Sequence, residues 1–182
     1  MKINSKDFAE YLKTSGLAEE LWMTDNELEP FDDPVCYEYF DKNPWIAERV
    51  PGIKDILDPA KEDVDALNQA FYLLCEEAPD IAERIYKDEV EDWFVNALVN
   101  TKYEFLHREI ALNAYLEHLI KEALPAENAQ TVLDACEFSS GRLEKLLSDK
   151  GFMEYAKNER DMDVLWDRTE ETLNPQHQGL GL

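Results

Sequence analysis

Glu104 and His107, which lie one helical turn apart, are the first candidates for chemistry in this chain. A Glu-x-x-His spacing places a carboxylate and an imidazole on one face of a helix, as in carboxylate-bridged di-iron bundles. Such a site needs a second motif of this kind and two further glutamates. Neither of the other histidines, His118 and His177, has Asp or Glu three residues before it. The motif therefore predicts at most half of a di-iron site, and the alternative is a solvated charged face.

Glu109 is the third candidate ligand, because its spacing puts a carboxylate inside an otherwise apolar arc of the same helix. Asn113 follows four residues later on the same face. A polar side chain at a core position needs a hydrogen-bonding partner. Two interpretations stay open. Glu109 lies at the edge of the arc or pairs with a lysine from another helix, or it lines a pocket as a ligand or general base together with Glu104 and His107.

The segment 101–124 is predicted to be a long helix that positions these groups. Its apolar residues share one arc at about 100° per residue, which is typical of a helix that faces a core. The members of this arc are Phe105, Leu112, Leu116, Leu119, Ile120 and Ala123. The opposite arc carries most of the polar side chains and is predicted to face solvent.

The remaining chain has frequent helix punctuation and almost no strand-like alternation. Asx-Pro pairs such as Asn43-Pro44 resemble helix starts, and Pro79 and Pro125 mark breaks. We predict an all-α fold of about 8–10 helices around the 101–124 helix. Residues 1–173 are predicted to form a single compact domain, with 1–50 as a smaller acidic cap and 174–182 as a mobile tail. The other predicted helices are 5–14, 17–24, 34–42, 44–49, 59–78, 80–99, 126–138, 140–149 and 152–172.

Composition excludes several classes of protein. The chain has 182 residues, with 41 acidic and 18 basic side chains and a net charge of −23. Its 45% hydrophobic content argues against extensive disorder. No apolar run approaches the roughly 18 residues of a membrane span, and the N-terminus has no hydrophobic signal region. Repulsion from phosphates disfavours direct binding to nucleic acids or anionic membranes. We therefore predict a cytoplasmic location.

The cysteines fit the same prediction. The chain contains three, Cys36, Cys75 and Cys136, which are widely spaced and form no Cys-x-x-Cys pair. An odd number without a framework spacing favours free thiols in a reducing compartment.

The negative charge is concentrated in the first half of the chain. Residues 1–92 carry 25 acids and 9 bases, whereas residues 93–182 carry 16 and 9. From residue 14 to 41 there are nine acids and no Lys or Arg, and a second dense patch surrounds Pro79. Such patches either keep a protein soluble or bind a basic partner. The candidate interaction surface consists of Glu27, Glu29, Asp32, Asp33, Glu76, Glu77, Asp80 and Glu83.

Three hypotheses for function follow. The first is a non-enzymatic cytosolic protein that contacts another protein, one with a basic surface, through its acidic surface. The second is a nucleic-acid-mimicking inhibitor of a DNA-binding protein. The third is a metal- or small-molecule-binding enzyme that uses Glu104, His107 and Glu109. No cofactor is predicted, because no phosphate-binding loop, nucleophile elbow or dinucleotide fingerprint occurs. A homodimer is left open.

Overall fold

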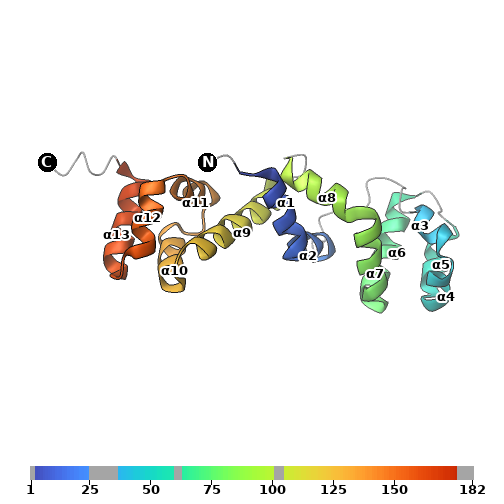
Figure 1. Ribbon diagram of the computed structural model, residues 1–182. Coiled ribbons are helices and arrows are strands. Elements are labelled where there is room, and N and C mark those ends of the chain that lie inside the picture. The colour runs from blue at the N-terminus through green and yellow to red at the C-terminus, as the bar shows by residue number, and fades with distance from the viewer. Residues whose placement is uncertain (1–2, 25–36, 60–62, 101–104, 176–182) are drawn as a thin grey trace. The chain divides into compact units, whose positions relative to one another are not determined.

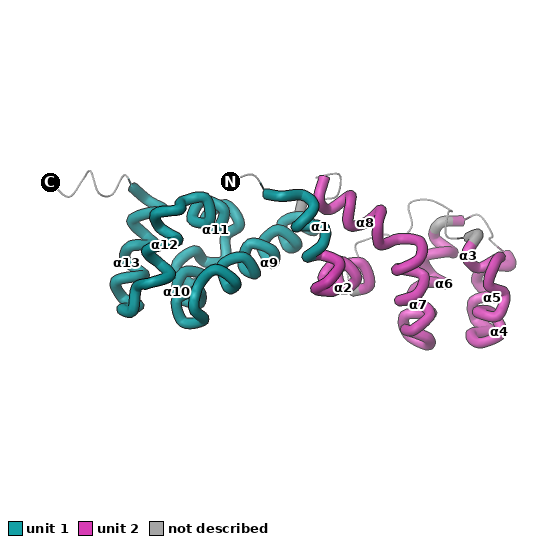
Figure 2. Tube along the Cα trace, in the orientation of Figure 1, with its two compact units in different colours: residues 1–11, 101–182 teal, residues 12–100 magenta. Residues whose placement is uncertain are grey.

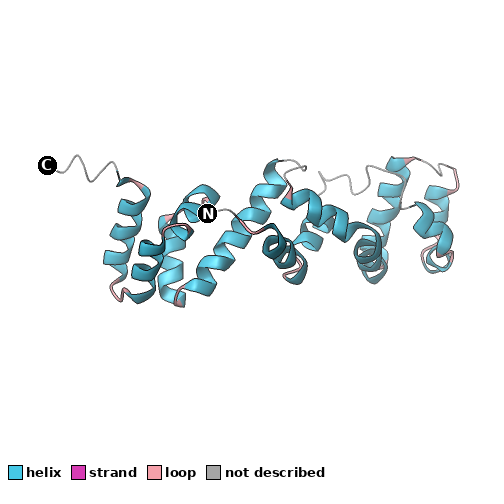
Figure 3. Ribbon diagram, turned by 45° about the horizontal axis from the view of Figure 1, so that its top comes forward, coloured by secondary structure: helices cyan, strands magenta, loops and turns pink. Residues whose placement is uncertain are grey.

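The chain is helical throughout the part that the computed structural model describes, residues 3–24, 37–59, 63–100 and 105–175 (Figure 1). Within those ranges no residue forms a strand (Figure 3). The predicted all-α class is therefore confirmed. Across the same ranges, each helix is too short or too polar to traverse a lipid bilayer.

The helices follow one another at short intervals. Their bounds are α1 Ser5–Thr14, α2 Leu17–Thr24, α3 Tyr37–Lys42, α4 Trp45–Arg49, α5 Gly52–Leu57, α6 Val64–Glu77, α7 Pro79–Ile85, α8 Glu91–Val99, α9 Phe105–Ala123, α10 Ala126–Ala135, α11 Ser140–Leu147, α12 Lys150–Asn158 and α13 Met162–Leu173. A π-helical turn, Tyr86–Val90, joins α7 to α8. The predicted central helix corresponds to α9, and residues 101–104 lie outside the described ranges.

The chain packs as two compact units (Figure 2). Unit 1 comprises residues 1–11 and 101–182, and unit 2 comprises residues 12–100. Helix α1 begins in unit 1 and its last residues belong to unit 2. The expected single domain over 1–173 stays a prediction, as does the expected tail, of which residues 176–182 lie outside the described ranges.

In unit 1, other helices pack against two faces of α9. Leu116 and Ile120 are fully buried, as their helical spacing predicts. Part of the opposite arc, which was expected to face solvent, is covered by α1, whereas Glu122 is exposed. The rings of Phe8 and Tyr115 stack at 5.0 Å, and those of Tyr11 and His118 stack at 4.8 Å. The aromatic side chains of α1 thus bury a face of α9 that looks polar in the sequence.

Two helix starts in unit 1 are completed by side chains. Asp149 accepts a hydrogen bond from the backbone N–H of Phe152 at the start of α12. Asp161 accepts from the N–H groups of Asp163 and Val164 at the start of α13. The predicted single helix 152–172 is therefore wrong, because the Asp161 cap starts a second helix that packs beside α12 (Figure 1).

Unit 2 has an aromatic core. The Trp22 ring of α2 lies 4.3 Å from Phe71 of α6 and 5.2 Å from Tyr86 in the π-helical turn. All three side chains are buried. A Cβ atom at Gly52 would lie 2.8 Å from a side-chain atom of Leu73, so α5 and α6 pack in close contact at this glycine.

Candidate functional site

Unit 2 carries most of the negative charge. Its 23 acidic and 7 basic side chains give a net charge of −16, whereas unit 1 has 18 acidic and 11 basic side chains and a net charge of −7. Repulsion among so many carboxylates destabilises a compact unit unless cations or counterions offset it. The placement of the few cations therefore decides where negative charge is left uncompensated.

Several cations of unit 2 join one helix to another. Arg49 of α4 donates two hydrogen bonds, of 2.7 and 2.9 Å, to the carboxylate of Asp80 in α7. These bonds lower the pKa of Asp80 below its ordinary value. Lys13 of α1 forms an ion pair with Asp92 of α8. The Arg84 guanidinium lies over the ring of Trp45, 5.7 Å from its centre. These cations hold helices together.

Lys87 serves two carboxylates from the π-helical turn. Its Nζ lies 2.9 Å from Glu91 and 3.8 Å from Glu19 of α2. Partial burial raises the pKa of Glu19, the carboxylate of Glu83 raises it further, and Lys87 opposes both effects. One ammonium group therefore stabilises a site where three carboxylates converge, which leaves the local charge negative.

The predicted interaction residues near Pro79 lie at the corner between α6 and α7. Glu76 and Glu77 end α6, Asp80 lies in the first turn of α7, and Glu83 follows one turn later. All four side chains are exposed. Asp80 is paired with Arg49, whereas the other three form no ion pair with any described residue. The other predicted members, Glu27, Glu29, Asp32 and Asp33, lie outside the described ranges.

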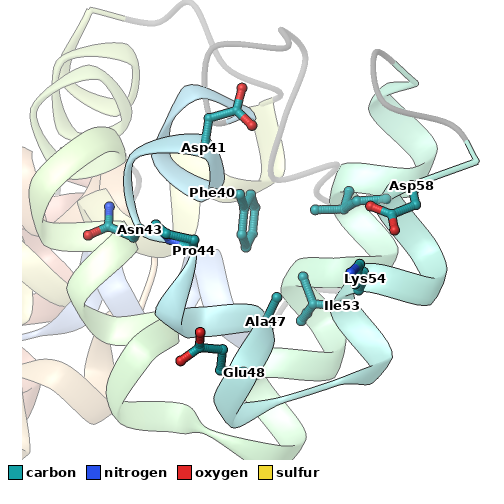
Figure 4. Close-up of a pocket in the computed structure, with 10 residues that line it drawn as sticks. Phe40, Asp41, Asn43, Pro44, Ala47, Glu48, Ile53, Lys54 and Asp58 are labelled. Carbon is teal, nitrogen blue, oxygen red and sulfur yellow. The ribbon is translucent and has the colours of Figure 1, made fainter.

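A pocket of about 360 Å³ lies between α3, α4 and α5 of unit 2 (Figure 4). Its apolar lining comes from side chains on all three helices and from the proline before α4. Phe40, Ile53 and Leu57 are each less than 10% exposed to solvent. The apolar residues that line it are Phe40, Pro44, Ala47, Ile53 and Leu57.

Charged side chains surround this apolar lining. Asp41 and Glu48 lie at opposite ends of the wall that contains Phe40 and Pro44, and Lys54 and Asp58 lie on the facing wall (Figure 4). Three carboxylates and one ammonium group give the rim a net negative charge. The described residues that line the pocket include no Ser, Thr, Cys, His or Tyr, so the pocket offers no hydroxyl or thiol nucleophile and no imidazole base.

Sequence patterns did not predict this pocket, because α5 was not predicted. In the sequence, Pro51 and Gly52 resemble a helix break. In the structure, Pro51 occupies the N-cap of α5. Ile53 and Leu57, four residues apart after that proline, are the signal that indicates the helix. Asn43-Pro44 does precede α4, but Asn43 does not cap it, because the Asn43 side chain donates to the Tyr39 carbonyl and accepts from the Trp45 indole.

The structure does not assemble the candidate ligands of unit 1 into one site. Glu104 lies outside the described ranges. His107 is buried, with 1% of its surface exposed. Glu109 is half-buried and accepts a 2.7 Å hydrogen bond from the Ser140 hydroxyl at the start of α11. Because residues two apart point to different faces of a helix, His107 and Glu109 do not converge.

Glu109 fits the interpretation of an edge position better than that of a pocket base. Its carboxylate is placed at the N-terminal end of α11, where negative charge is favourable and where the N-cap, Ser139, forms no side-chain capping bond. Asn113, one turn along α9, is half-buried, and its carbonyl oxygen has no hydrogen-bond partner among the described residues. In the same part of the chain, no three His, Cys, Asp or Glu side chains are arranged to hold a metal ion.

The described thiols are held in their protonated form. Burial raises the pKa of Cys75 to about 11 and that of Cys136 to about 12. Neither is a reactive thiolate near neutral pH. Cys36 lies outside the described ranges.

Comparison of the chain with models of known protein families, with curated proteins and with solved structures finds no match.

Proposed function

We propose that this protein binds another protein through the acidic surface of unit 2, in a non-enzymatic and cytoplasmic role, and that the partner presents a basic surface. The uneven charge of the two units carries the proposal. Unit 2 has a net charge of −16 in 89 residues, and four of its cations are already engaged with other helices. Among the described carboxylates of unit 2, Glu76, Glu77 and Glu83 are exposed and form no ion pair, so they are available to a partner.

A basic partner would gain binding energy by relieving repulsion that the free protein carries. Carboxylates that repel one another raise the free energy of the unbound state, and an approaching cationic surface lowers it. Complementary charge also speeds the encounter and rejects acidic competitors. Affinity that arises in this way falls steeply as salt is added.

The acidic residues at the corner between α6 and α7 support this role, because two of them lie where a negative charge destabilises a helix. Glu76 and Glu77 lie at the C-terminal end of α6, whose last turn has no basic residue. Carboxylates at that end oppose the helix dipole. Their exposure at a sharp helix corner makes them accessible to a partner.

Charge neutralisation at this corner tests the proposal. The variant E76Q/E77Q/E83Q keeps side-chain size and changes the net charge from −23 to −20. We expect the immobilised full-length variant to lose partners that the wild-type protein captures from a lysate. Partners captured by the wild type should dissociate in about 1 M NaCl, where the Debye length is about 3 Å.

The matched variant E127Q/D167N/E170Q makes the same change in charge at exposed positions of unit 1. It should retain the partners. Equal loss in both variants, or capture that is indifferent to salt and to the corner substitutions, would contradict the proposal. Displacement of a captured partner by duplex DNA would instead indicate the nucleic-acid-mimicking role.

A further inference from the structure

We propose that the pocket between α3, α4 and α5 anchors the partner by taking one bulky apolar side chain from a segment that has Lys or Arg on both sides of it. This inference rests on the proposed function and names the chemistry of the partner. It assigns a specific contact to named residues of unit 2, so it does not follow from net charge alone.

The pocket is large enough to take a bulky side chain. Its volume of about 360 Å³ lies near the lower end of the range of about 300–1,000 Å³ that is typical of small-molecule sites. The lining residues Phe40, Ile53 and Leu57 provide its apolar surface, and the charged rim provides the polar part. Burial of an aliphatic or aromatic side chain there removes apolar area from water on both partners.

The rim determines what must flank that side chain. Asp41 and Glu48 lie at opposite ends of one wall, and Asp58 and the single cation, Lys54, lie on the other (Figure 4). An extended segment whose apolar side chain enters the pocket therefore passes a carboxylate on either side. Cations at those two places are complementary, and phosphate or carboxylate groups are repelled. Nucleotides and acidic peptides are disfavoured for the same reason.

The walls of the pocket are already fixed in the free protein. The Asn43 side chain bridges the Tyr39 carbonyl, at 2.9 Å, and the Trp45 indole, at 3.2 Å, which sets the turn between α3 and α4. Arg49 ties α4 to Asp80 of α7 through two hydrogen bonds. Binding therefore requires little further ordering of these elements, and pre-organisation of this kind favours affinity.

A pair of defined peptides tests the inference on the full-length protein. The probe is a peptide with two lysines, a serine, a central leucine, a serine and two lysines, and its comparison peptide has glycine in place of the leucine. We expect the leucine peptide to bind about fivefold or more tightly in fluorescence anisotropy at about 50 mM NaCl. The methyl NMR signals of Ala47, Ile53 and Leu57 should shift with the leucine peptide and not with the glycine peptide.

Filling the pocket separates this contact from general attraction. Ala47→Phe places a ring in the pocket without changing the net charge, and it should remove the preference for leucine while binding of the glycine peptide stays the same. Ala123→Phe, at an exposed position at the end of α9, is the matched control and should keep the preference. The wild-type methyl shifts decide the question if the Ala47 variant does not fold.

The rim variant D41N/E48Q/D58N should weaken binding of both peptides by the same factor and leave their ratio unchanged. Equal affinity of the two peptides for the wild-type protein, or binding without shifts at the pocket methyl groups, would overturn the pocket inference. Neither outcome affects the proposed function, which fails in a different experiment, when the corner variant E76Q/E77Q/E83Q keeps every partner. Equally tight binding of a leucine peptide with serines in place of its lysines would also overturn the inference.

Discussion

The two units use polar side chains in different ways. In unit 1 such side chains complete the ends of helices. Asn128 of α10 donates hydrogen bonds of 2.7 and 2.8 Å to the carbonyls of Ala156 and Glu159 at the end of α12. Asp149 and Asp161 cap the starts of α12 and α13. These bonds satisfy backbone groups that otherwise have no partner within the helix, and those of Asn128 also join α10 to α12.

In unit 2 polar side chains tie one helix to another across the surface. Lys13 reaches Asp92, and Lys87 reaches Glu19. The Tyr39 hydroxyl donates a 3.2 Å hydrogen bond to Asp88. Among the described helices of this unit, α4, α5, α7 and α8 have no side-chain cap on their first turn, whereas Asp63 caps α6.

This difference indicates which unit is suited to electrostatic binding. A hydrogen bond that completes a helix end is little affected by salt, whereas an exposed ion pair is screened. Unit 2 therefore keeps charged groups at its surface, where a partner can compete for them. Unit 1 has the smaller net charge, −7.

The largest effect is expected where a helix-end bond of unit 1 is removed. Asn128→Ala deletes two hydrogen bonds and leaves carbonyl groups at the end of α12 without their donor. We expect a loss of about 2–3 kcal/mol in the free energy of unfolding, measured by chemical denaturation.

Asn158→Ala is the matched control. Its amide is exposed and donates only to Glu154, one turn earlier in the same helix. It should cost less than about 0.5 kcal/mol. Similar losses of stability in the two variants would show that the buried bonds of Asn128 contribute no more than the exposed bonds of Asn158.

The contact between α9 and α11 is expected to contribute less. Ser140→Ala removes the 2.7 Å hydrogen bond to Glu109 and leaves a half-buried carboxylate with one partner fewer. The expected loss is about 1–2 kcal/mol, because hydrogen bonds to charged groups exceed neutral ones. Ser148→Ala, which removes a hydroxyl that bonds to the Glu144 carbonyl of its own helix, should cost less. An unchanged free energy of unfolding in Ser140→Ala would show that Glu109 does not depend on this contact.

One stabilising substitution is expected in unit 1. Glu137 and Phe138 follow α10 with φ angles of 52° and 54°, a conformation that favours glycine. Glu137→Gly should raise the free energy of unfolding by about 0.5–1 kcal/mol. Ser139→Gly, at a φ of −77°, should instead lower it. Destabilisation by Glu137→Gly would show that the Glu137 side chain contributes more than its backbone conformation costs.

The fold class was predictable from the sequence, because helical order depends on local signals. The α9 stripe and the proline breaks are visible in single segments, and they predict most of the helices. Two boundaries were missed for local reasons. Pro51-Gly52 starts a helix instead of ending one, and Asp161 caps a new helix inside an unbroken polar pattern.

The candidate site was less predictable, because its pocket depends on contacts between helices. Charge density alone indicated that Glu76, Glu77 and Glu83 would be exposed. No pattern in one segment indicates that Phe40 and Ile53 line the same pocket, since that depends on how α5 packs against α3 and α4. Likewise, the burial of Tyr115 required α1, which is about a hundred residues away in sequence.

The smallest effect is expected for a surface ion pair of unit 2. Arg49→Gln removes the two hydrogen bonds that lower the pKa of Asp80. A carboxyl group whose pKa is lowered by folding stabilises the protein above its ordinary pKa of 3.8, and this contribution is lost as the pH falls through the lowered value. The variant should therefore be slightly less stable than the wild type near neutral pH and equal to it in strong acid. Carboxyl NMR titration should show the pKa of Asp80 rising toward its ordinary value.

The Arg142–Glu137 pair of unit 1 provides the matched comparison, because it is also exposed but has a single contact of 3.3 Å. Arg142→Gln should leave the free energy of unfolding unchanged at every pH. High salt should reduce the effect of Arg49→Gln and leave that of Asn128→Ala intact, since screening acts on exposed charges and not on a buried amide bond. If the Arg49 variant loses more stability than the Asn128 variant, then surface ion pairs are not the weaker constraint. Unit 2 would then have fewer charges available for a partner.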